Sequence, residues 1–336
     1  MQRCIELAKN GLGTTYPNPL VGSVIVHNNK IIGEGWHYQA GQPHAEVNAI
    51  NSVKDKSLLK NATIYVSLEP CSHFGKTPPC ADLITKHHIK NVVIGCVDSF
   101  SEVSGRGIEK LKAKGCNVTV GVLEEECLKL NKRFFTFHTK QRPYIILKWA
   151  ETSDGFIAPD NNSQITWITN TYSRQLVHKL RAEEQAILIG TNTALIDNPK
   201  LNSRDWHGTH PVRVVLDKQL RIPSTHSIFD QSIKTIVITE VNKVSSANIV
   251  YEHIDFSSQI AQQICTILYK HQIQSVIIEG GAQTLQTFID SNIWDEAYMF
   301  KGPNTFTSGL KSPQLNGHMA SSKPIKDNQL IVYNND

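Results

Sequence analysis

The sequence predicts two successive α/β domains, and three observations support that fold class. The chain has 336 residues, a length that suits two domains of ordinary size. Strand-like apolar runs alternate with helix-like segments, which is typical of layered α/β domains. The alternation stops in a polar, basic stretch that ends at Pro143, and then it restarts. We therefore expect one domain over residues 1–141 and a second over residues 142–336.

The elements expected in the first half follow from local pattern. Residues 1–12 carry apolar side chains at helical spacing, and Pro17 and Pro19 then exclude helix. Strands over 20–26 and 30–36 flank an Asn28-Asn29 turn and predict a hairpin. The other expected elements are a helix from near residue 44, a strand over 63–68, a helix from 78 to about 88, a strand over 91–97, a helix over 106–114, a strand over 117–122 and a final helix over 123–139.

The second half repeats the alternation but not the motifs of the first, since no His-x-Glu or cysteine pair recurs. Its informative junction is a buried strand that ends in Gly280-Gly281 before a helix. Backbone amides at such a helix start can bind phosphate, although a glycine turn that only links strand to helix is an equal alternative. We expect strands over 144–149, 186–190, 212–217, 235–239, 275–279 and 295–300, and helices over about 171–180, over about 258–271 and after residue 281.

Composition limits the classes of protein that this chain can be. Hydrophobic residues at 40% and charged residues at 19% fit a soluble globular protein, and a net charge of +4 is too mild to imply nucleic-acid binding. No apolar run reaches the roughly 18 residues of a membrane span, and the start lacks the apolar core of a signal peptide. Seven cysteines, an odd number, indicate a reducing cytoplasm without disulfides. A homo-oligomer is compatible with the sequence.

The segment from His44 to Cys80 carries the clearest chemistry. One imidazole, His44, and two thiols, Cys71 and Cys80, can hold a zinc ion and leave a fourth position open, as catalytic zinc sites do. Zinc lowers the pKa of its bound water to about 7. Glu46 lies two residues past His44, where its carboxylate can move protons without binding the metal. His-x-Glu followed by Pro-Cys and a second Cys is the signature of zinc deaminases.

Other interpretations of these residues remain open. Cys71 and Cys80 could form a disulfide or belong to a structural metal site, and His73 could close the site as a fourth ligand. Glu69 is as well explained by capping of backbone donors as by catalysis. His44 and Cys80 both fall at expected helix starts, where the helix dipole favours a neutral imidazole and a thiolate.

The spacing of the cysteines points to a family. Eight residues separate Cys71 from Cys80, where nucleic-acid and free-nucleoside deaminases have two, and the loop ends in Gly-Lys-Thr-Pro-Pro-Cys. This half resembles the deaminase domain of the bifunctional riboflavin-biosynthesis deaminase–reductases. The second half resembles the family's reductase domain through these segments: 147–148, 153–155, 167–169, 180–181, 189–193, 197–204 and 279–281.

The resemblance implies a fold, two activities and two cofactors. It implies a cytidine-deaminase-like three-layer domain followed by a dihydrofolate-reductase-like domain that binds NADPH. The implied reactions are zinc-dependent deamination of a phosphoribosyl-pyrimidine and then NADPH-dependent reduction of its ribosyl group to ribityl. The expected partners are thus small molecules, with no nucleic acid and no membrane.

Site residues follow by matching positions. The resemblance places the catalytic acid at Glu46 and the metal ligands at His44, Cys71 and Cys80. The implied NADPH contacts are Ala150, Trp167, Thr193, Asp197, Gly281, Ala282, Gln283, Thr284, Leu285, Gln286 and Thr287. The implied substrate contacts are Asn18, Lys76, Lys148, Arg181, Leu201, Arg204 and Glu279.

Several of these residues have simpler explanations. Lys76 could be a solvated loop charge, and Trp167 and Leu201 could be core residues. Arg181 and Arg204 suit bidentate binding of a phosphate, but both could pair with surface acids instead. The chain also departs from the family pattern, with Ile165 where a Ser is common and with a different run at 301–306.

Two other classes of function stay open at this stage. One is a deaminase of nucleosides or tRNA with an appended inactive domain, against which the mild charge and the long cysteine loop argue. The other is a binding module in which zinc only stabilises the fold.

Overall fold

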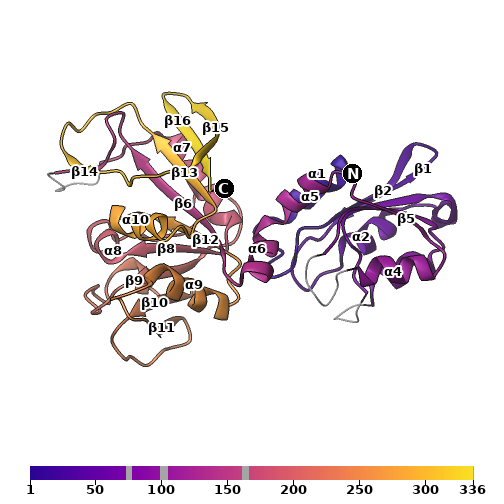
Figure 1. Ribbon diagram of the computed structural model, residues 1–336, viewed down its shortest axis with the longest axis horizontal. Helices are drawn as coiled ribbons and strands as arrows, with labels where there is room; N and C mark the ends of the chain where they lie inside the picture. The colour runs from indigo at the N-terminus through magenta and orange to yellow at the C-terminus, as the bar shows by residue number, and fades with distance from the viewer. Residues whose placement is uncertain (73–77, 99–104, 161–165, 336) are drawn as a thin grey trace. The chain divides into compact units, whose positions relative to one another are not determined.

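The structure is a computed structural model, and it describes residues 1–72, 78–98, 105–160 and 166–335. The chain divides into two compact units, Met1–Gln141 and Arg142–Asp336 (Figure 1). His73, Lys76 and Ile165, which the sequence singled out, lie outside the described residues.

The N-terminal unit is built around a five-stranded sheet in the order β2-β1-β3-β4-β5. Strand β1 pairs antiparallel with β2 and β3, whereas β3, β4 and β5 run parallel. Its strands are β1 (Gly22–His27), β2 (Lys30–Trp36), β3 (Thr63–Leu68), β4 (Asn91–Cys96) and β5 (Asn117–Val120). Its helices are α1 (Gln2–Ala8), α2 (Ala45–Ser52), α3 (Cys80–Lys86), α4 (Arg106–Ala113), α5 (Glu124–Leu130) and α6 (Lys132–Lys140), with short 3-10 turns η1 (Lys9–Gly11) and η2 (Lys56–Asn61).

Helices cover both faces of this sheet. Alternate strand residues point to opposite faces, so each face can carry its own apolar cluster. Residues of α2, α3 and α4 pack with Ile25, Ile64 and Ile94 in one cluster. On the other side, α1 packs against Val24, and Cys127 of α5 packs against Leu68. The unit therefore has the three layers that the resemblance implied.

Helix α2 approaches the sheet unusually closely, because two glycines of β2 lie beneath it. A Cβ on Gly33 would lie 2.6 Å from the carbonyl oxygen of Ala49, and one on Gly35 would lie 2.6 Å from the amide nitrogen of Ala49. Only glycine permits this distance between backbones. The height of α2 above the sheet is therefore set by the absence of side chains.

The C-terminal unit contains a nine-stranded sheet in the order β11-β10-β9-β8-β12-β6-β13-β16-β15. The first seven strands in this order pair in parallel, and β16 and β15 add antiparallel partners at one side. Its strands are β6 (Tyr144–Glu151), β8 (Ala186–Gly190), β9 (Val212–Leu216), β10 (Thr235–Thr239), β11 (Ile249–His253), β12 (Ser275–Glu279), β13 (Glu296–Lys301), β15 (His318–Ile325) and β16 (Asn328–Asn334). A two-stranded sheet pairs β7 (Phe156–Pro159) with β14 (Gly309–Lys311).

Helices again cover both faces. They are α7 (Thr171–Glu183), α8 (Thr191–Asp197), α9 (Ile260–Lys270) and α10 (Ala282–Asp290), with a 3-10 turn η3 (Ser227–Phe229). Residues of α9 and α10 share a core with Ile145 and Leu147 of β6. Residues of α7 and α8 share a second core with Ile146, which lies on the opposite face of β6. A mostly parallel sheet buried on both faces is the α/β class that the sequence predicted.

One expected element is wrong in detail. The segment 123–139 was expected to form a single helix, but it forms α5 and α6 with a break at Asn131. The side chain of Asn131 accepts a hydrogen bond from the amide of Leu20 at 2.7 Å and donates to the carbonyl of Leu20 at 2.9 Å. A buried pair of hydrogen bonds to a distant loop thus fixes the site of the break.

Two further expectations concern cysteines and membranes. All seven cysteines lie among the described residues and are free thiols. No helix in the described ranges has the length and apolar character needed to cross a bilayer.

Candidate active sites

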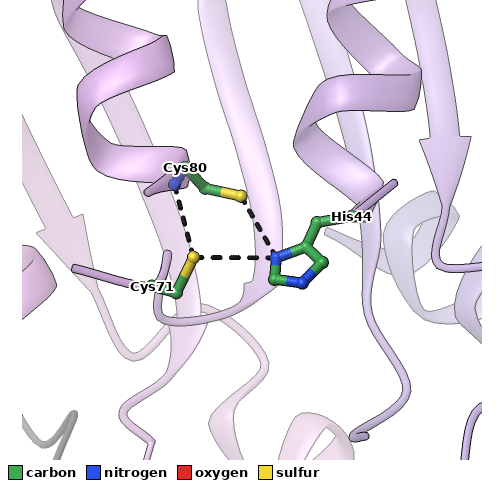
Figure 2. A group of neighbouring side chains, drawn as sticks. All are labelled: His44, Cys71 and Cys80. Atoms are coloured by element: carbon green, nitrogen blue, oxygen red, sulfur yellow. Dashed lines mark hydrogen bonds between the residues drawn. The ribbon is translucent and has the colours of Figure 1, made fainter. Parts of the chain in front are cut away.

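Three structural elements bring the expected metal ligands together. His44 is the N-cap of α2, Cys71 follows β3 by three residues, and Cys80 is the first residue of α3. Figure 2 shows their side chains converging on one point. The site therefore rests on two helix starts and a strand end, which fixes the backbone of each ligand.

The distances between the donor atoms fit zinc. Nδ1 of His44 lies 3.6 Å from Sγ of Cys71 and 3.4 Å from Sγ of Cys80. Tetrahedral zinc, with Zn–S of about 2.3 Å and Zn–N of about 2.0 Å, would separate such ligands by roughly 3.5 Å. Among the described residues these three form the one group of His, Cys, Asp and Glu side chains close enough to share a metal. Within the described residues, one imidazole and two thiols therefore fit a zinc ion, and no fourth protein ligand joins them.

The electrostatics favour a thiolate at Cys71, whereas the interaction with Cys71 raises the pKa of the Cys80 thiol. The pKa of the Cys71 thiol is lowered because the Cys80 side chain, its backbone N–H and His44 all interact with the sulfur. The backbone amide of Cys80 donates to that sulfur at 3.3 Å. A thiolate is the form that binds metal. The interaction with Cys71 also raises the pKa of His44.

Glu46 lies in the first turn of α2, beside these ligands, and only 3% of it is exposed. Burial, followed by the negative charge of Cys71, raises its pKa to about 7. A carboxyl group whose pKa lies near neutrality can both accept and release a proton. A bound dication nearby would favour the carboxylate.

Glu69 answers one of the open alternatives, since its buried carboxylate caps backbone donors. Oε1 accepts from the amides of Gly107 at 2.8 Å and Ile108 at 3.3 Å. Oε2 accepts from the amides of Gly105 at 3.0 Å and Asp98 at 3.3 Å. Glu69 therefore anchors the start of α4 against the strand end that delivers Cys71.

Asn18 lies beside His37, a histidine that the sequence analysis did not single out. The ring of His37 is 3% exposed and packs edge-on at 5.4 Å from the ring of His44. Its Nδ1 lies 3.1 Å from the carbonyl of Pro43, which can only accept, so Nδ1 carries the proton. Nε2 then accepts from the side-chain amide of Asn18 at 3.0 Å, which fixes the orientation of that amide. No local motif marks His37 in the sequence.

In the C-terminal unit, three predicted substrate residues form an ion cluster. Lys148 donates to Oε1 of Glu279 at 2.7 Å, and Arg181 donates to Oε2 at 2.8 Å. Lys148 and Glu279 are register partners on the adjacent parallel strands β6 and β12. Burial opposes the charge on Glu279, but Arg181 and Lys148 prevail and lower its pKa to about 2. The carboxylate therefore stays ionised at neutral pH.

The glycine turn after β12 forms a cradle next to α8. Gly280 and Gly281 have φ of +88° and +75°, which favour glycine. A Cβ on Gly280 would lie 3.0 Å from Cγ2 of Thr193, and one on Gly281 would lie 3.3 Å from its Oγ1. The backbone amides at a helix start lack intrahelical partners, and with a hydroxyl beside them they fit the phosphates of a dinucleotide. Burial, with the charge of Glu279, raises the pKa of Asp197 in the same helix as Thr193.

The other predicted cofactor and substrate residues differ in how deeply they are buried. Leu285 is fully buried in the core, whereas Gly280 and Gly281, just before α10, are the residues that lie beside Thr193. Leu201 is 2% exposed and is also a core residue, as one alternative held. Trp167 is 56% exposed, so it is not core, and it lines an open pocket together with Arg204. Ala150 is half-buried on β6.

Comparison with known proteins finds two families along this chain. Residues 1–96 match the family profile "Cytidine and deoxycytidylate deaminase zinc-binding region", and residues 143–321 match "RibD C-terminal domain". The curated "Riboflavin biosynthesis protein RibD" of Aquifex aeolicus is 41% identical over 94% of this chain and 89% of its own length. The protein of the same name from Synechocystis is 38% identical over 95% of this chain and 87% of its own length.

Two solved structures superpose on both halves of this chain. A diaminohydroxyphosphoribosylaminopyrimidine deaminase/5-amino-6-(5-phosphoribosylamino)uracil reductase from Thermotoga maritima superposes with a TM-score of 0.91 at 39% identity, covering 99% of this chain and 97% of that one. RibD of Acinetobacter baumannii superposes with a TM-score of 0.89 at 32% identity, with the same coverage of both chains.

Proposed function

This chain belongs to the RibD family of bifunctional riboflavin-biosynthesis deaminase–reductases, and from this we propose that its two units act in succession on one phosphoribosyl-pyrimidine. Residues 1–141 deaminate 2,5-diamino-6-(5-phosphoribosylamino)pyrimidin-4-one hydrolytically. Residues 142–336 reduce the ribosyl group of 5-amino-6-(5-phosphoribosylamino)uracil to ribityl with NADPH. The observation that carries the first activity is the convergence of His44, Cys71 and Cys80 beside buried Glu46.

In the deaminase unit, Nδ1 of His44 and the sulfurs of Cys71 and Cys80 would hold the zinc ion. When bound, zinc makes water acidic enough to supply hydroxide at neutral pH. Glu46 accepts the proton of the attacking water and delivers it to the departing amine, so that a C–O bond forms as the C–N bond breaks and ammonia leaves. Asn18, oriented by His37, contacts the substrate, and Lys76 is the cation that we propose for its phosphate.

In the reductase unit, Lys148, Arg181 and Glu279 position the substrate through their ion cluster. The start of α10, with Thr193 and Asp197, would bind NADPH, which supplies the hydride. The side chains of this unit therefore need only hold cofactor and substrate in line and exclude water. Ala150, Trp167 and Arg204 complete the proposed lining of this site, and the buried Leu201 supports it from the core.

The decisive variant is Glu46→Gln, which keeps the shape of the side chain but cannot transfer the proton. We expect ammonia release to fall by about 10² to 10⁴, because a positioned acid–base group contributes that much. Zinc content and NADPH oxidation should stay at wild-type levels, since Glu46 is not a ligand and belongs to the other unit. The measurements are an ammonia assay, metal analysis and nicotinamide absorbance.

A matched control is Glu125→Gln, which makes the same chemical change at an exposed acid of the same unit. It should leave deamination unchanged. If zinc only stabilised the fold, Glu46→Gln would deaminate as fast as the control, and the proposed mechanism would be wrong. Deamination of cytidine or tRNA by the wild-type protein would instead favour the nucleoside or tRNA deaminase, which no observation above supports.

We also propose that the protein works in the cytoplasm, because all seven of its thiols are free. Association into a homo-oligomer is compatible with this function, and light scattering of the purified protein would measure it.

A further inference from the structure

The proposed substrate carries a phosphate, and Arg181 is poorly placed to bind it in the reductase unit. Nε and Nη2 of Arg181 donate to one oxygen of Glu279 at 3.1 and 2.8 Å, and Nη1 donates to the carbonyl of Asn202 at 3.3 Å. The bidentate edge of the guanidinium is therefore already used by a carboxylate. The side chain is also only 11% exposed.

Arg204 is in the opposite situation. Its side chain is 50% exposed, and its contacts with Asp205 at 3.9 Å and with Oδ1 of Asn202 at 3.5 Å are both long. Since Asn202 also accepts from Arg181, Arg204 adjoins the ion cluster of Glu279 through one shared residue. Arg204 thus retains donors that a ligand could use.

A second guanidinium lines the same pocket. Arg174, in the first turn of α7, faces an open pocket of about 390 Å³ that Arg204 also lines, with Trp167 and Tyr172 among its walls. The guanidinium carbon of Arg174 lies 4.4 Å from the ring centroid of Trp167. This stacking fixes the plane of the guanidinium, and within the described part of the chain its N–H donors pair with no acid.

The charges around this pocket favour an anion. Two guanidinium groups oppose one carboxylate, Asp205, whose side chain is 54% exposed. A third cation, Nζ of Lys326, donates to the hydroxyl of Tyr172 at 2.8 Å. Clustered arginines with free planar edges are typical of phosphate sites.

We propose that Arg174 and Arg204 together bind the phosphate of the phosphoribosyl-pyrimidine in the reductase unit, an inference that rests on the function proposed above. Arg181 acts on the substrate through Glu279 instead. Arg174 thus becomes a binding residue that sets the preference for a phosphorylated substrate over its dephosphorylated form.

The test compares two substrates in the reductase assay, 5-amino-6-(5-phosphoribosylamino)uracil and the same compound without its phosphate. In Arg174→Gln we expect KM for the phosphorylated substrate to rise about tenfold or more, because a charge-assisted contact is lost. The kcat and the rate with the dephosphorylated substrate should stay near wild type. In Arg174→Lys, KM for the phosphorylated substrate should lie between the wild-type value and that of Arg174→Gln, since lysine keeps the charge but lacks the planar fork.

Lys270→Gln is the charge control, because it removes one positive charge from an exposed position on α9. It should behave as wild type with both substrates. Arg204→Gln gives a second, independent variant, and it should show the same selective loss.

Three outcomes would overturn or redirect the inference. An equal loss with both substrates would show that Arg174 acts only through the fold or Trp167. No loss with either would show that the phosphate binds elsewhere. A wild-type protein that reduces neither substrate would instead contradict the proposed function itself.

Discussion

Glu69 illustrates how a single side chain can organise a metal site without touching the metal. Its two carboxylate oxygens accept from three backbone amides at the start of α4, where the helix dipole also favours negative charge, and from the amide of Asp98 after β4. A Cβ on Gly107 would lie 2.0 Å from the carbonyl oxygen of Pro70, so α4 rests directly on the residue before Cys71. Glu69 is therefore a positioning residue for a zinc ligand.

We expect Glu69→Gln to destabilise the N-terminal unit by about 2 to 4 kcal/mol, because an amide NH₂ would then oppose backbone N–H donors that stay buried. Urea unfolding would measure the loss. Glu109→Gln is a matched control, since Glu109 is an exposed acid of α4, the helix whose start Glu69 caps. Equal stability of the two variants would contradict the capping role.

The ligand set itself could be predicted from residues, because His-x-Glu and the Pro-Cys…Cys spacing encode it locally. His37 and Arg174 could not, since each acquires its role from a partner that only folding brings near. His37 contacts Asn18, and Arg174 contacts Trp167, without a spacing that signals either pair. The same holds for Asn131, whose hydrogen bonds to Leu20 interrupt a helix that local pattern predicts to be continuous.

At the scale of elements, the buried parallel strands were the most predictable. The bounds of β3, β8, β10 and β12 agree with the sequence prediction. For the last three, the reason is that a strand buried on both faces is a short, largely apolar run. Sequence analysis did not identify β7, α8, β11, β14, β15 or β16. Strand β15 is mostly exposed and rich in polar residues, so its pairing with β16 defines it rather than its composition.

The junction between β12 and α10 yields a prediction of its own. Gly281→Ala should raise KM for NADPH about tenfold, because the backbone has φ of +75° and the new methyl group would press on Thr193. Deamination should not change. Steady-state kinetics that follow nicotinamide absorbance would measure it.

Gly115→Ala provides the control for backbone strain alone. Gly115 has φ of +81°, and a Cβ there would meet nothing within 4 Å. It should cost some stability in the N-terminal unit and leave KM for NADPH unchanged. A similar effect of both variants on KM would argue against a cofactor role for the glycine turn.

On the scale of the whole molecule, each unit has hydrophobic cores of its own. The clusters of the first unit use residues up to Phe135, and those of the second begin at Tyr144. A domain with its own core can in principle fold alone. The two proposed activities should therefore be separable.

Zinc removal tests this separation. We expect a chelator to abolish ammonia release while NADPH oxidation continues, and added zinc should restore the first activity. Fragments 1–141 and 142–336, expressed alone, should divide the two activities in the same way. If NADPH oxidation stopped when zinc is removed, the second unit would depend on the metal site.

The two glycines beneath α2 have a consequence for how this catalyst can evolve. Helix α2 carries both His44 and Glu46, and it lies on bare backbone at Gly33 and Gly35. Any mutation of either glycine adds at least one carbon atom, which would lift the helix and tilt both groups away from the sulfurs. The added carbon would also overpack the contact between α2 and the sheet, which destabilises the unit. Purifying selection on these two codons would then act on turnover and on folding together.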